Sequence, residues 1–148
     1  AVGLAVDVDV NAICLAEKNI KKHDLSFRLK LVQSDLYESV ELGARFDLIV
    51  SNPPYIPKSA RLDCSVISWE DEKALFAGRD GLDCIKNIVF QMPNYISDKG
   101  IAVLECDSSN VGDTESLMAR VFGKNNVRII NDQYNIPRFV IMSRVRFF

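Results

Sequence analysis

Short apolar runs alternate along the chain with segments in which apolar residues recur at helical spacing. Runs typical of buried strands lie at residues 2–6, 29–32, 46–50, 101–104, 127–130 and 139–145. Helical spacing occurs at residues 12–20, 85–92 and 113–122. This order predicts an α/β fold with a doubly wound, mostly parallel sheet that ends in antiparallel strands.

Local signals predict where these elements begin and end. Asn11 is a candidate N-cap for the first helix, which we expect to end near His23. Pro93 should disturb the second helix, and Lys99-Gly100 is expected to turn the chain into the next strand. The turn Tyr134-Asn135-Ile136-Pro137 predicts an antiparallel final pair, whereas residues 57–69 read as a polar loop.

Composition narrows the classes of protein to consider. The chain has 148 residues, of which 48% are hydrophobic, which suits one domain with a real core. Its net charge of −2 provides no basic surface for nucleic acid. No apolar run approaches the roughly 20 residues of a membrane helix, and no basic-then-apolar leader opens the sequence. We therefore expect no direct contact with nucleic acid or membrane.

The cysteines and the single histidine offer little metal chemistry. Cys14, Cys64, Cys84 and Cys106 are far apart and form no C-x-x-C pair, so buried, reduced thiols are expected rather than zinc ligands or disulfides. His23 is the only histidine, so a metal site built on several histidines has little support. We expect His23 near a helix C-terminus, where a positive charge is favourable.

The third predicted strand runs directly into Asn52-Pro53-Pro54-Tyr55, the most informative stretch of the chain. Two prolines end strand pairing and hold the backbone in a rigid corner. The Asn52 side-chain oxygen and the Pro53 carbonyl can accept both hydrogens of a planar NH2 group, while the Tyr55 ring can stack on it. The corner can thus present a nitrogen lone pair to an electrophile.

A structural interpretation of the same residues exists. An isolated Asn-Pro pair is usually a turn that ends a strand, and Tyr55 could be a core aromatic. The complete tetrapeptide directly after an apolar strand favours the functional interpretation.

The tetrapeptide resembles the signature of amino-directed methyltransferases that use S-adenosylmethionine. The flanking segments narrow the resemblance to the protein-(glutamine-N5) methyltransferases of the HemK/PrmC type, which modify peptide-chain release factors in translation termination. The segments with this likeness are Ala5-Val6-Asp7, Gln33-Ser34-Asp35-Leu36, 69–75, 78–82, Leu104-Glu105 and 132–138. Asp71 and Val10 depart from the family, which commonly has proline at both positions.

The resemblance implies roles for particular residues. Asn52, Pro53 and Tyr55 would be catalytic, and Asn52, Pro53, Pro54, Tyr55 and Glu70 would bind the glutamine substrate. The release factor would be the protein partner of a monomer. Arg138 matches a family arginine and is interpreted as structural.

Three polar residues follow three successive predicted strands, which places them at one edge of the sheet where ligands bind in open α/β folds. Asp7 can accept both ribose hydroxyls of S-adenosylmethionine, and Asp35 can accept from the adenine amino group. Leu36 and Asn52 complete the implied cofactor site. A single Asp is more often a helix cap or a loop carboxylate, and Asp9 competes with Asp7 for the ribose.

The resemblance also implies that residues 1–148 are a partial methyltransferase domain, without the family's first central strand, its glycine-rich cofactor loop and its N-terminal domain. The strands ending at Asp7 and Asn52 would then leave a gap, pair with each other or borrow a strand. We expect the isolated polypeptide to bind cofactor weakly and to be marginally stable.

Two alternatives to glutamine methylation remain open. One is an amino methyltransferase acting on adenine or cytosine, which the acidic pI of about 5.4 disfavours. The other is a truncated form that only binds partners. Reduced thiols fit a cytoplasmic protein, or a mitochondrial one if the source is a eukaryote.

Overall fold

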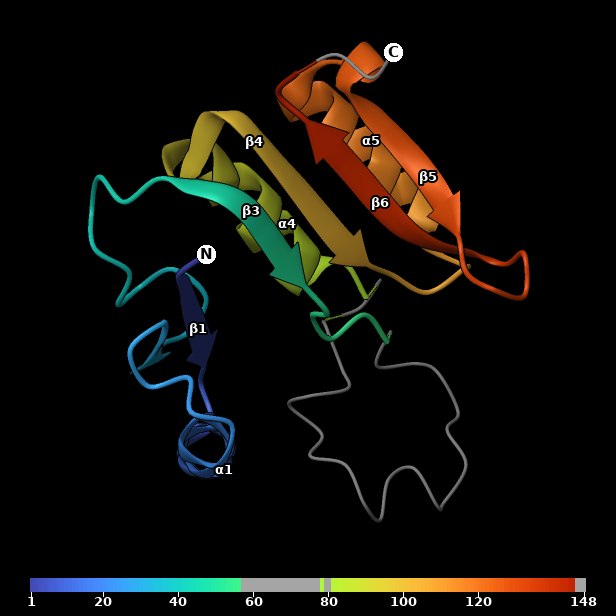
Figure 1. The fold of residues 1–148 in the computed structure, drawn as a ribbon. Coiled ribbons are helices and arrows are strands. Elements are labelled where there is room, and N and C mark those ends of the chain that lie inside the picture. Colours follow the sequence, from blue (N-terminus) through green and yellow to red (C-terminus); the bar gives the residue numbers. More distant parts are fainter. Residues whose placement is uncertain (57–77, 79–80, 146–148) are drawn as a thin grey trace. The chain divides into compact units, whose positions relative to one another are not determined.

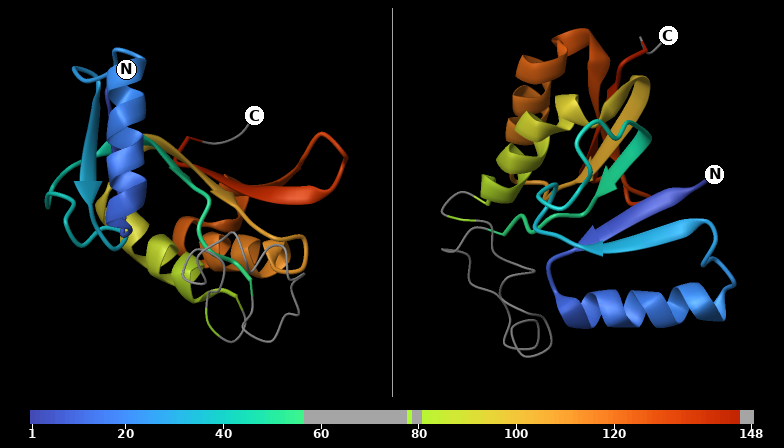
Figure 2. Two further views of the ribbon diagram at one scale, coloured as in Figure 1. Left: turned by 90° about the horizontal axis from the view of Figure 1, so that it is seen from below. Right: turned by 90° about the vertical axis from the view of Figure 1, so that its left-hand side faces the viewer.

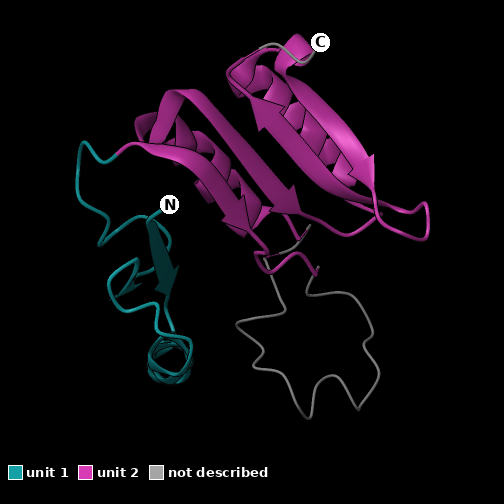
Figure 3. Ribbon diagram, viewed as in Figure 1, with its two compact units in different colours: residues 1–44 teal, residues 45–148 magenta. Residues whose placement is uncertain are grey.

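The computed structural model describes residues 1–56, 78 and 81–145. The chain divides into two units, Ala1–Ala44 and Arg45–Phe148, and each has its own sheet (Figure 3). No helix of the described residues is long and apolar enough to cross a bilayer.

The first unit is a β-α-β arrangement. Strand β1 (Gly3–Asp7) pairs in parallel with β2 (Leu29–Gln33), and helix α1 (Val10–Lys22) connects them (Figure 1). A helical connection is typical of parallel strands, because the chain must return to the end of the sheet where the first strand began before the second strand can run in the same direction. The predicted strands and helix are confirmed here.

Helix α1 begins one residue before the predicted N-cap. The cap is Asp9, whose Oδ1 accepts a hydrogen bond from the backbone N–H of Asn11 at 2.9 Å, so the prediction of Asn11 as the cap is wrong. Asp and Asn cap helices equally well, and the sequence offers both within three residues. The predicted end is confirmed, because His23 is the C-cap and Lys21 and Lys22 occupy the last turn, where cations are favoured.

The second unit is a four-stranded sheet with two helices. Its strands lie in the order β3-β4-β6-β5. In chain order the elements are β3 (Phe46–Ser51), α4 (Asp83–Gln91), the 3-10 turn η1 (Met92–Asn94), β4 (Ile96–Glu105), α5 (Val111–Phe122), the 3-10 turn η2 (Lys124–Asn126), β5 (Val127–Asn131) and β6 (Pro137–Ser143). The helical pattern around residue 85 therefore ends at Gln91, and Pro93 falls in the tighter turn, as predicted.

Strand directions in this sheet agree with the sequence pattern. β3 and β4 are parallel, whereas β6 runs antiparallel to both β4 and β5. The predicted antiparallel pair at the end of the chain is thus confirmed. Within the first unit β1 pairs with β2, and within the second β3 pairs with β4.

The predicted turn at Lys99-Gly100 is wrong. These residues lie inside β4, which begins at Ile96, and the pairing of β3 with β4 shifts register between Phe46 and Leu48. A Cβ atom at position 100 would lie 3.0 Å from the Phe46 carbonyl oxygen and closer still to the Ile96 side chain. Gly100 thus allows a close approach of two strands, which glycine can do as readily as form a turn.

The core of the second unit lies between its sheet and its helices. Helices α4 and α5 cover the same face of the sheet (Figures 1 and 2). Fully buried side chains from both layers meet there: Ile85, Val89, Met92, Met118, Ala102, Leu104, Val140 and Met142. In β3, Leu48 and Val50 are 58% and 67% exposed, so alternate residues of this edge strand lie outside the core.

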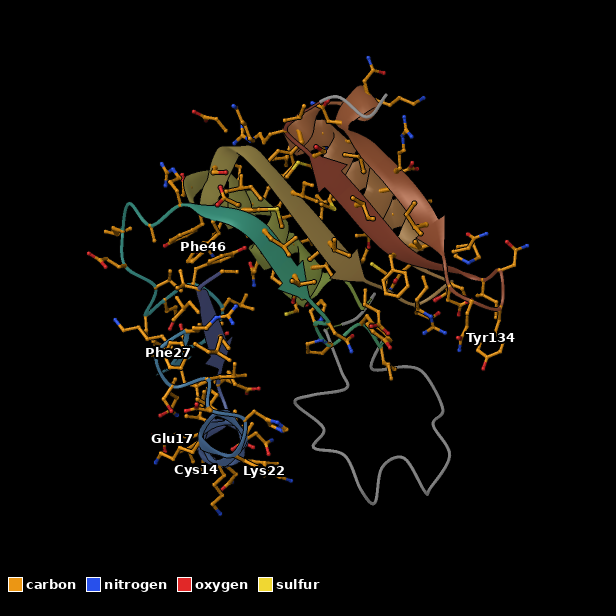
Figure 4. All side chains as sticks on the ribbon, in the orientation of Figure 1. Cys14, Glu17, Lys22, Phe27, Phe46 and Tyr134 are labelled. Atoms are coloured by element: carbon orange, nitrogen blue, oxygen red, sulfur yellow. The ribbon has the colours of Figure 1, made fainter. Side chains whose placement is uncertain are left out.

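The described cysteines are free thiols, as expected, but not all of them are buried. Cys14, Cys84 and Cys106 are free thiols. Cys106 is buried, but Cys14 is exposed on α1 (Figure 4), which contradicts the expectation of burial. Helix α1 is short of buried positions, with Ile20 its one buried residue, so a small apolar side chain on its outer face remains in solvent. No group of metal-binding side chains is found among the described residues.

Candidate active site

The Asn52–Tyr55 corner leaves the sheet beside the ends of two other strands. Ser51 pairs with Leu104 near the end of β4, and Glu105 pairs with Phe139 at the start of β6. The β5–β6 turn, marked by Tyr134 in Figure 4, lies at this same end because both of its strands are antiparallel to their neighbours. The carboxyl end of β3, the carboxyl end of β4 and the amino end of β6 therefore come together.

Exposure differs along the corner. Asn52 is exposed, Pro53 is buried, and Pro54 and Tyr55 are half-buried. A buried proline with a fixed φ anchors the corner in the second unit. The exposed amide next to it is accessible to a substrate from solvent, as a receptor for an NH2 group requires.

Tyr55 is hydrogen-bonded through its backbone within the second unit, and charged side chains lie near its phenol. Its backbone carbonyl accepts a hydrogen bond from Nδ2 of Asn110 at 3.0 Å. Burial raises the pKa of the Tyr55 phenol, and the nearby Glu105 carboxylate adds to this rise. The positive charge of the nearby Arg138 guanidinium opposes both effects. The phenol is therefore neutral near pH 7.

The sequence did not point to Asn110, and Arg138 was interpreted as structural. The place of Arg138 near the corner could have been predicted only from strand register, because an antiparallel β6 has its first residues beside the end of β4. The role of Asn110 is harder to predict from the sequence. Asn110 is the N-cap residue of α5, where an Asn side chain normally accepts a hydrogen bond from the helix backbone, but its side chain makes no capping bond.

The backbone after β4 is also well fixed. Hydrogen bonds from Ser109 lower the pKa of the Asp107 carboxyl, whose Oδ1 accepts from the Ser109 N–H at 2.9 Å. Burial raises the pKa of the Cys106 thiol, which therefore remains protonated. Cys106 is thus a packed thiol and not a nucleophile.

Asp7 and Asp35 come together in the first unit. Asp7 pairs with Gln33, and the Ser34 N–H donates to the Asp7 carbonyl at 2.9 Å, which places Asp35 next to the end of β1. Both carboxylates are exposed. Two exposed acceptors at neighbouring strand ends fit the hydroxyls and amino group of a nucleoside.

The loop after β2 is held by the buried side chain of Ser34. Its Oγ donates to the Leu36 carbonyl at 3.0 Å and accepts from the Ser39 N–H at 2.9 Å. Leu36 adopts a φ of +48°, which is uncommon for a side chain of this size. The turn is therefore built to a specific shape, in which Asp35 is exposed and Leu36 is half-buried.

Asp9, the competitor of Asp7, has a different task. Its Oδ1 caps α1, while its own N–H donates to Oδ1 of Asp7 at 2.9 Å. Asp9 therefore has a structural task at the start of the helix. In each of the two carboxylates Oδ1 accepts one hydrogen bond, and no bond of either Oδ2 to a described residue is seen, so the preference for Asp7 rests on the resemblance.

Replacing Asp9 by Ala should destabilise the protein by about 1 kcal/mol, because the start of α1 loses its capping bond. The affinity for a nucleoside cofactor should change little. Urea unfolding of the 148-residue chain measures the first effect, and cofactor titration of the protein at its natural length measures the second. A large loss of cofactor affinity in Asp9→Ala would instead assign the ribose to Asp9.

Several predicted residues lie outside the described residues. They are the predicted polar loop 57–69, Cys64, Glu70, the segment 69–75, Arg79 and Asp80. Gly78 and Gly81 are described and both have positive φ, of +76° and +74°. Gly81 lies two residues before α4, which begins at Asp83.

Comparison with known proteins places the chain among methyltransferases. Residues 3–67 match the methyltransferase small domain family. A ribosomal protein uL3 glutamine methyltransferase of Francisella tularensis is 42% identical over 106 residues, 70% of this chain and 33% of the relative. A release factor glutamine methyltransferase of Rhodopirellula baltica is 31% identical over 142 residues, 95% of this chain and 48% of the relative.

The fold agrees with that of solved methyltransferases. The Thermus thermophilus 16S rRNA N2 G1207 methyltransferase, solved with AdoMet and guanosine, has a TM-score of 0.66 at 18% identity over 97% of this chain and 31% of its own. A Pyrococcus furiosus methyltransferase has a TM-score of 0.68 at 17% identity, with 95% of this chain and 61% of that chain covered. The predicted fold class is confirmed.

The chain therefore belongs to the S-adenosylmethionine-dependent methyltransferases, among the relatives of the glutamine methyltransferases. It spans about a third to a half of the length of these two curated relatives.

Proposed function

We propose that this protein transfers a methyl group from S-adenosylmethionine to the side-chain amide nitrogen of a glutamine in a protein of the translation machinery. The observation that carries the proposal is the corner after β3, with Asn52 exposed beside a buried Pro53. The names of its relatives support glutamine as the acceptor. Residues 1–148 would form part of one methyltransferase domain, in a monomeric protein.

The cofactor would bind through the strand ends of the first unit. Asp7 would accept the ribose hydroxyls, Asp35 the adenine amino group, and Leu36 would provide apolar contact. Exposure of both carboxylates and the fixed turn after β2 fit these roles. When bound, S-adenosylmethionine supplies an electrophilic methyl group.

The corner would act by orientation and by hydrogen bonding. The Asn52 side-chain oxygen and the Pro53 carbonyl would each accept one hydrogen of the glutamine NH2, so that the nitrogen lone pair points away from them. The nitrogen becomes positive as it gains its methyl group, and it returns to neutral when it releases one of its two protons to solvent. Hydrogen bonds to charged groups contribute about 1.5–3 kcal/mol, against about 1 for neutral ones. The acceptors would thus bind the transition state more tightly than the substrate.

Tyr55 would stack on the planar amide, Pro54 would shape the pocket wall, and Glu70 would support the peptide around the glutamine. Burial keeps the Tyr55 phenol neutral, so the ring places no negative charge beside the substrate nitrogen that would compete with the Asn52 and Pro53 oxygens. Positioning of this kind can account for a large share of a barrier reduction.

Two protein substrates are in question. The release-factor relative matches nearly the whole chain, including its last strands, which favours the Gly-Gln-Gln segment of a release factor. The uL3 relative is more similar where it matches, at 42% identity, so ribosomal protein uL3 is the second candidate.

The test is a comparison of acceptors with the protein at its natural length and labelled S-adenosylmethionine. Purified release factor, uL3 and a DNA duplex are offered separately and then in competition. We expect label in a translation protein, with release factor preferred over uL3. Label in DNA with none in either protein would contradict the proposal, and label in uL3 alone would correct its substrate.

A further inference from the structure

The side chain of Asn110 is the most unusual polar group in the second unit. Asn110 is 5% exposed, and its buried Oδ1 has no hydrogen-bond partner among the residues that the structure describes. A buried acceptor without a partner is destabilising, so such a group needs an explanation. Because only the NH2 half of the amide can donate to a carbonyl, its bond to Tyr55 fixes which way the side chain faces.

The backbone of Asn110 is rigidly placed. Its carbonyl accepts both the N–H of Thr114 and, at 3.0 Å, the Thr114 hydroxyl, and its N–H donates to the Asp107 carbonyl at 3.1 Å. Thr114 is fully buried. The start of α5 is therefore a stable platform, from which one amide reaches the backbone of the corner.

Arg138 lies near the start of β6, and its positive charge lowers the pKa of the nearby Tyr55 phenol. Its carbonyl accepts from the Cys106 N–H at 2.9 Å, which ties it to the end of β4. Its Nε lies 3.9 Å from Oδ2 of Asp132. Asp132 is itself held, because its Oδ1 accepts from the N–H groups of Tyr134 and Ile136 at 2.8 and 3.0 Å. The β5–β6 turn thus orients the Arg138 guanidinium, whose charge acts on the phenol.

We propose that Asn110 and Arg138 are positioning residues that fix Tyr55 at its backbone and at its phenol, and thereby set the geometry of the glutamine-binding corner. This inference rests on the proposed function. The two points of attachment come from α5 and from β6, so the orientation of the ring depends on both elements. A ring fixed at one end only would tilt, and errors of about 1 Å in such sites can lower turnover by about a hundredfold.

The first test reads Tyr55 directly and needs no activity. Ring-labelled tyrosine NMR of the 148-residue chain follows the Tyr55 phenol through alkaline titration, with Tyr55→Phe to assign the signal. Arg138→Met should raise the pKa of Tyr55 further, because the cation that lowers it is lost. Arg138→Lys should restore part of the shift. Asn110→Ala should alter the ring signal at neutral pH.

Matched controls exist in the same unit. Asn126 donates from Nδ2 to the Phe122 carbonyl at 2.8 Å, the same type of bond as that of Asn110 but away from the corner. Arg144 lies 5.4 Å from the centre of the Phe122 ring and offers a second arginine–aromatic contact. Asn126→Ala and Arg144→Met should leave the Tyr55 signal unchanged.

The second test is turnover with the preferred protein acceptor, at the natural length of the protein. Asn110→Ala and Arg138→Met should each lower kcat about tenfold with little change in the KM for S-adenosylmethionine. In a Tyr55→Phe background, Arg138→Met should have no further effect, because the phenol it holds is gone. The control variants should retain full turnover.

The outcomes separate the two claims. A Tyr55 signal that neither variant alters would overturn the positioning role, as would unchanged turnover in both variants. Equal losses from Arg138→Met with and without the phenol would also overturn it, since the arginine would then act elsewhere. A wild-type protein that methylates no glutamine contradicts the proposed function instead, and the NMR titration still decides whether the two residues hold Tyr55.

Discussion

Replacing Asn52 by Ala should lower turnover of glutamine methylation by about 10²–10³-fold, the usual effect of removing one preorganised hydrogen-bonding group from a site where charge develops. The Asn52 side-chain oxygen accepts one hydrogen of the substrate NH2 in our account, and this bond strengthens as the nitrogen becomes positive. Steady-state transfer of labelled methyl to the preferred acceptor measures the effect. The KM for S-adenosylmethionine should change far less than kcat.

Stability separates this loss of function from a loss of fold. Asn52 is exposed, so Asn52→Ala should change the free energy of unfolding by no more than about 0.5 kcal/mol. Asn125→Ala is a suitable control, because Asn125 is also an exposed asparagine of the second unit. Turnover of Asn52→Ala within a factor of two or so of the control would remove Asn52 from the mechanism.

Replacing Asp7 by Ala should weaken binding of S-adenosylmethionine by about 10- to 100-fold, since two hydroxyl donors would lose a charged acceptor. Isothermal titration of the protein at its natural length measures the dissociation constant. The loss should appear equally with S-adenosylhomocysteine, because the ribose is common to both.

Two other aspartate variants, Asp9→Ala and Asp98→Ala, test whether a loss of cofactor affinity is specific to Asp7. Asp98 is an exposed carboxylate of β4 in the second unit, and its removal should leave cofactor affinity unchanged. Asp9→Ala should cost stability but little affinity, because Asp9 caps α1. Cofactor affinity that is preserved in Asp7→Ala would refute the assignment of Asp7 to the ribose.

Local patterns predicted the strands and helices well where burial and periodicity agree. The runs at residues 29–32 and 127–130 became β2 and β5, and Pro93 ended α4 because a helix cannot continue through its missing N–H. The errors arose where one residue type suits two structures. Asp9 and Asn11 are equally good caps, and Gly100 serves a close approach of strands instead of a turn.

The candidate site was predictable only where its chemistry is local in sequence. The corner at residues 52–55 and the aspartates at strand ends follow from single segments. The positions of Asn110 and Arg138 near Tyr55 do not follow from a single segment. They depend on the register of β6 against β4 and on the direction in which the Asn110 amide faces. Such contacts join residues about fifty or more positions apart, and no local propensity encodes them.

The most direct test of the account is fragmentation mass spectrometry of the methylated acceptor protein, which locates the new methyl group on an atom. We expect it on the side-chain amide nitrogen of a single glutamine, because the corner accepts two hydrogens from a flat NH2 group. A methyl group found on a lysine, on an α-amino group or on a carboxylate would contradict this geometry, and with it the role given to Asn52 and Pro53.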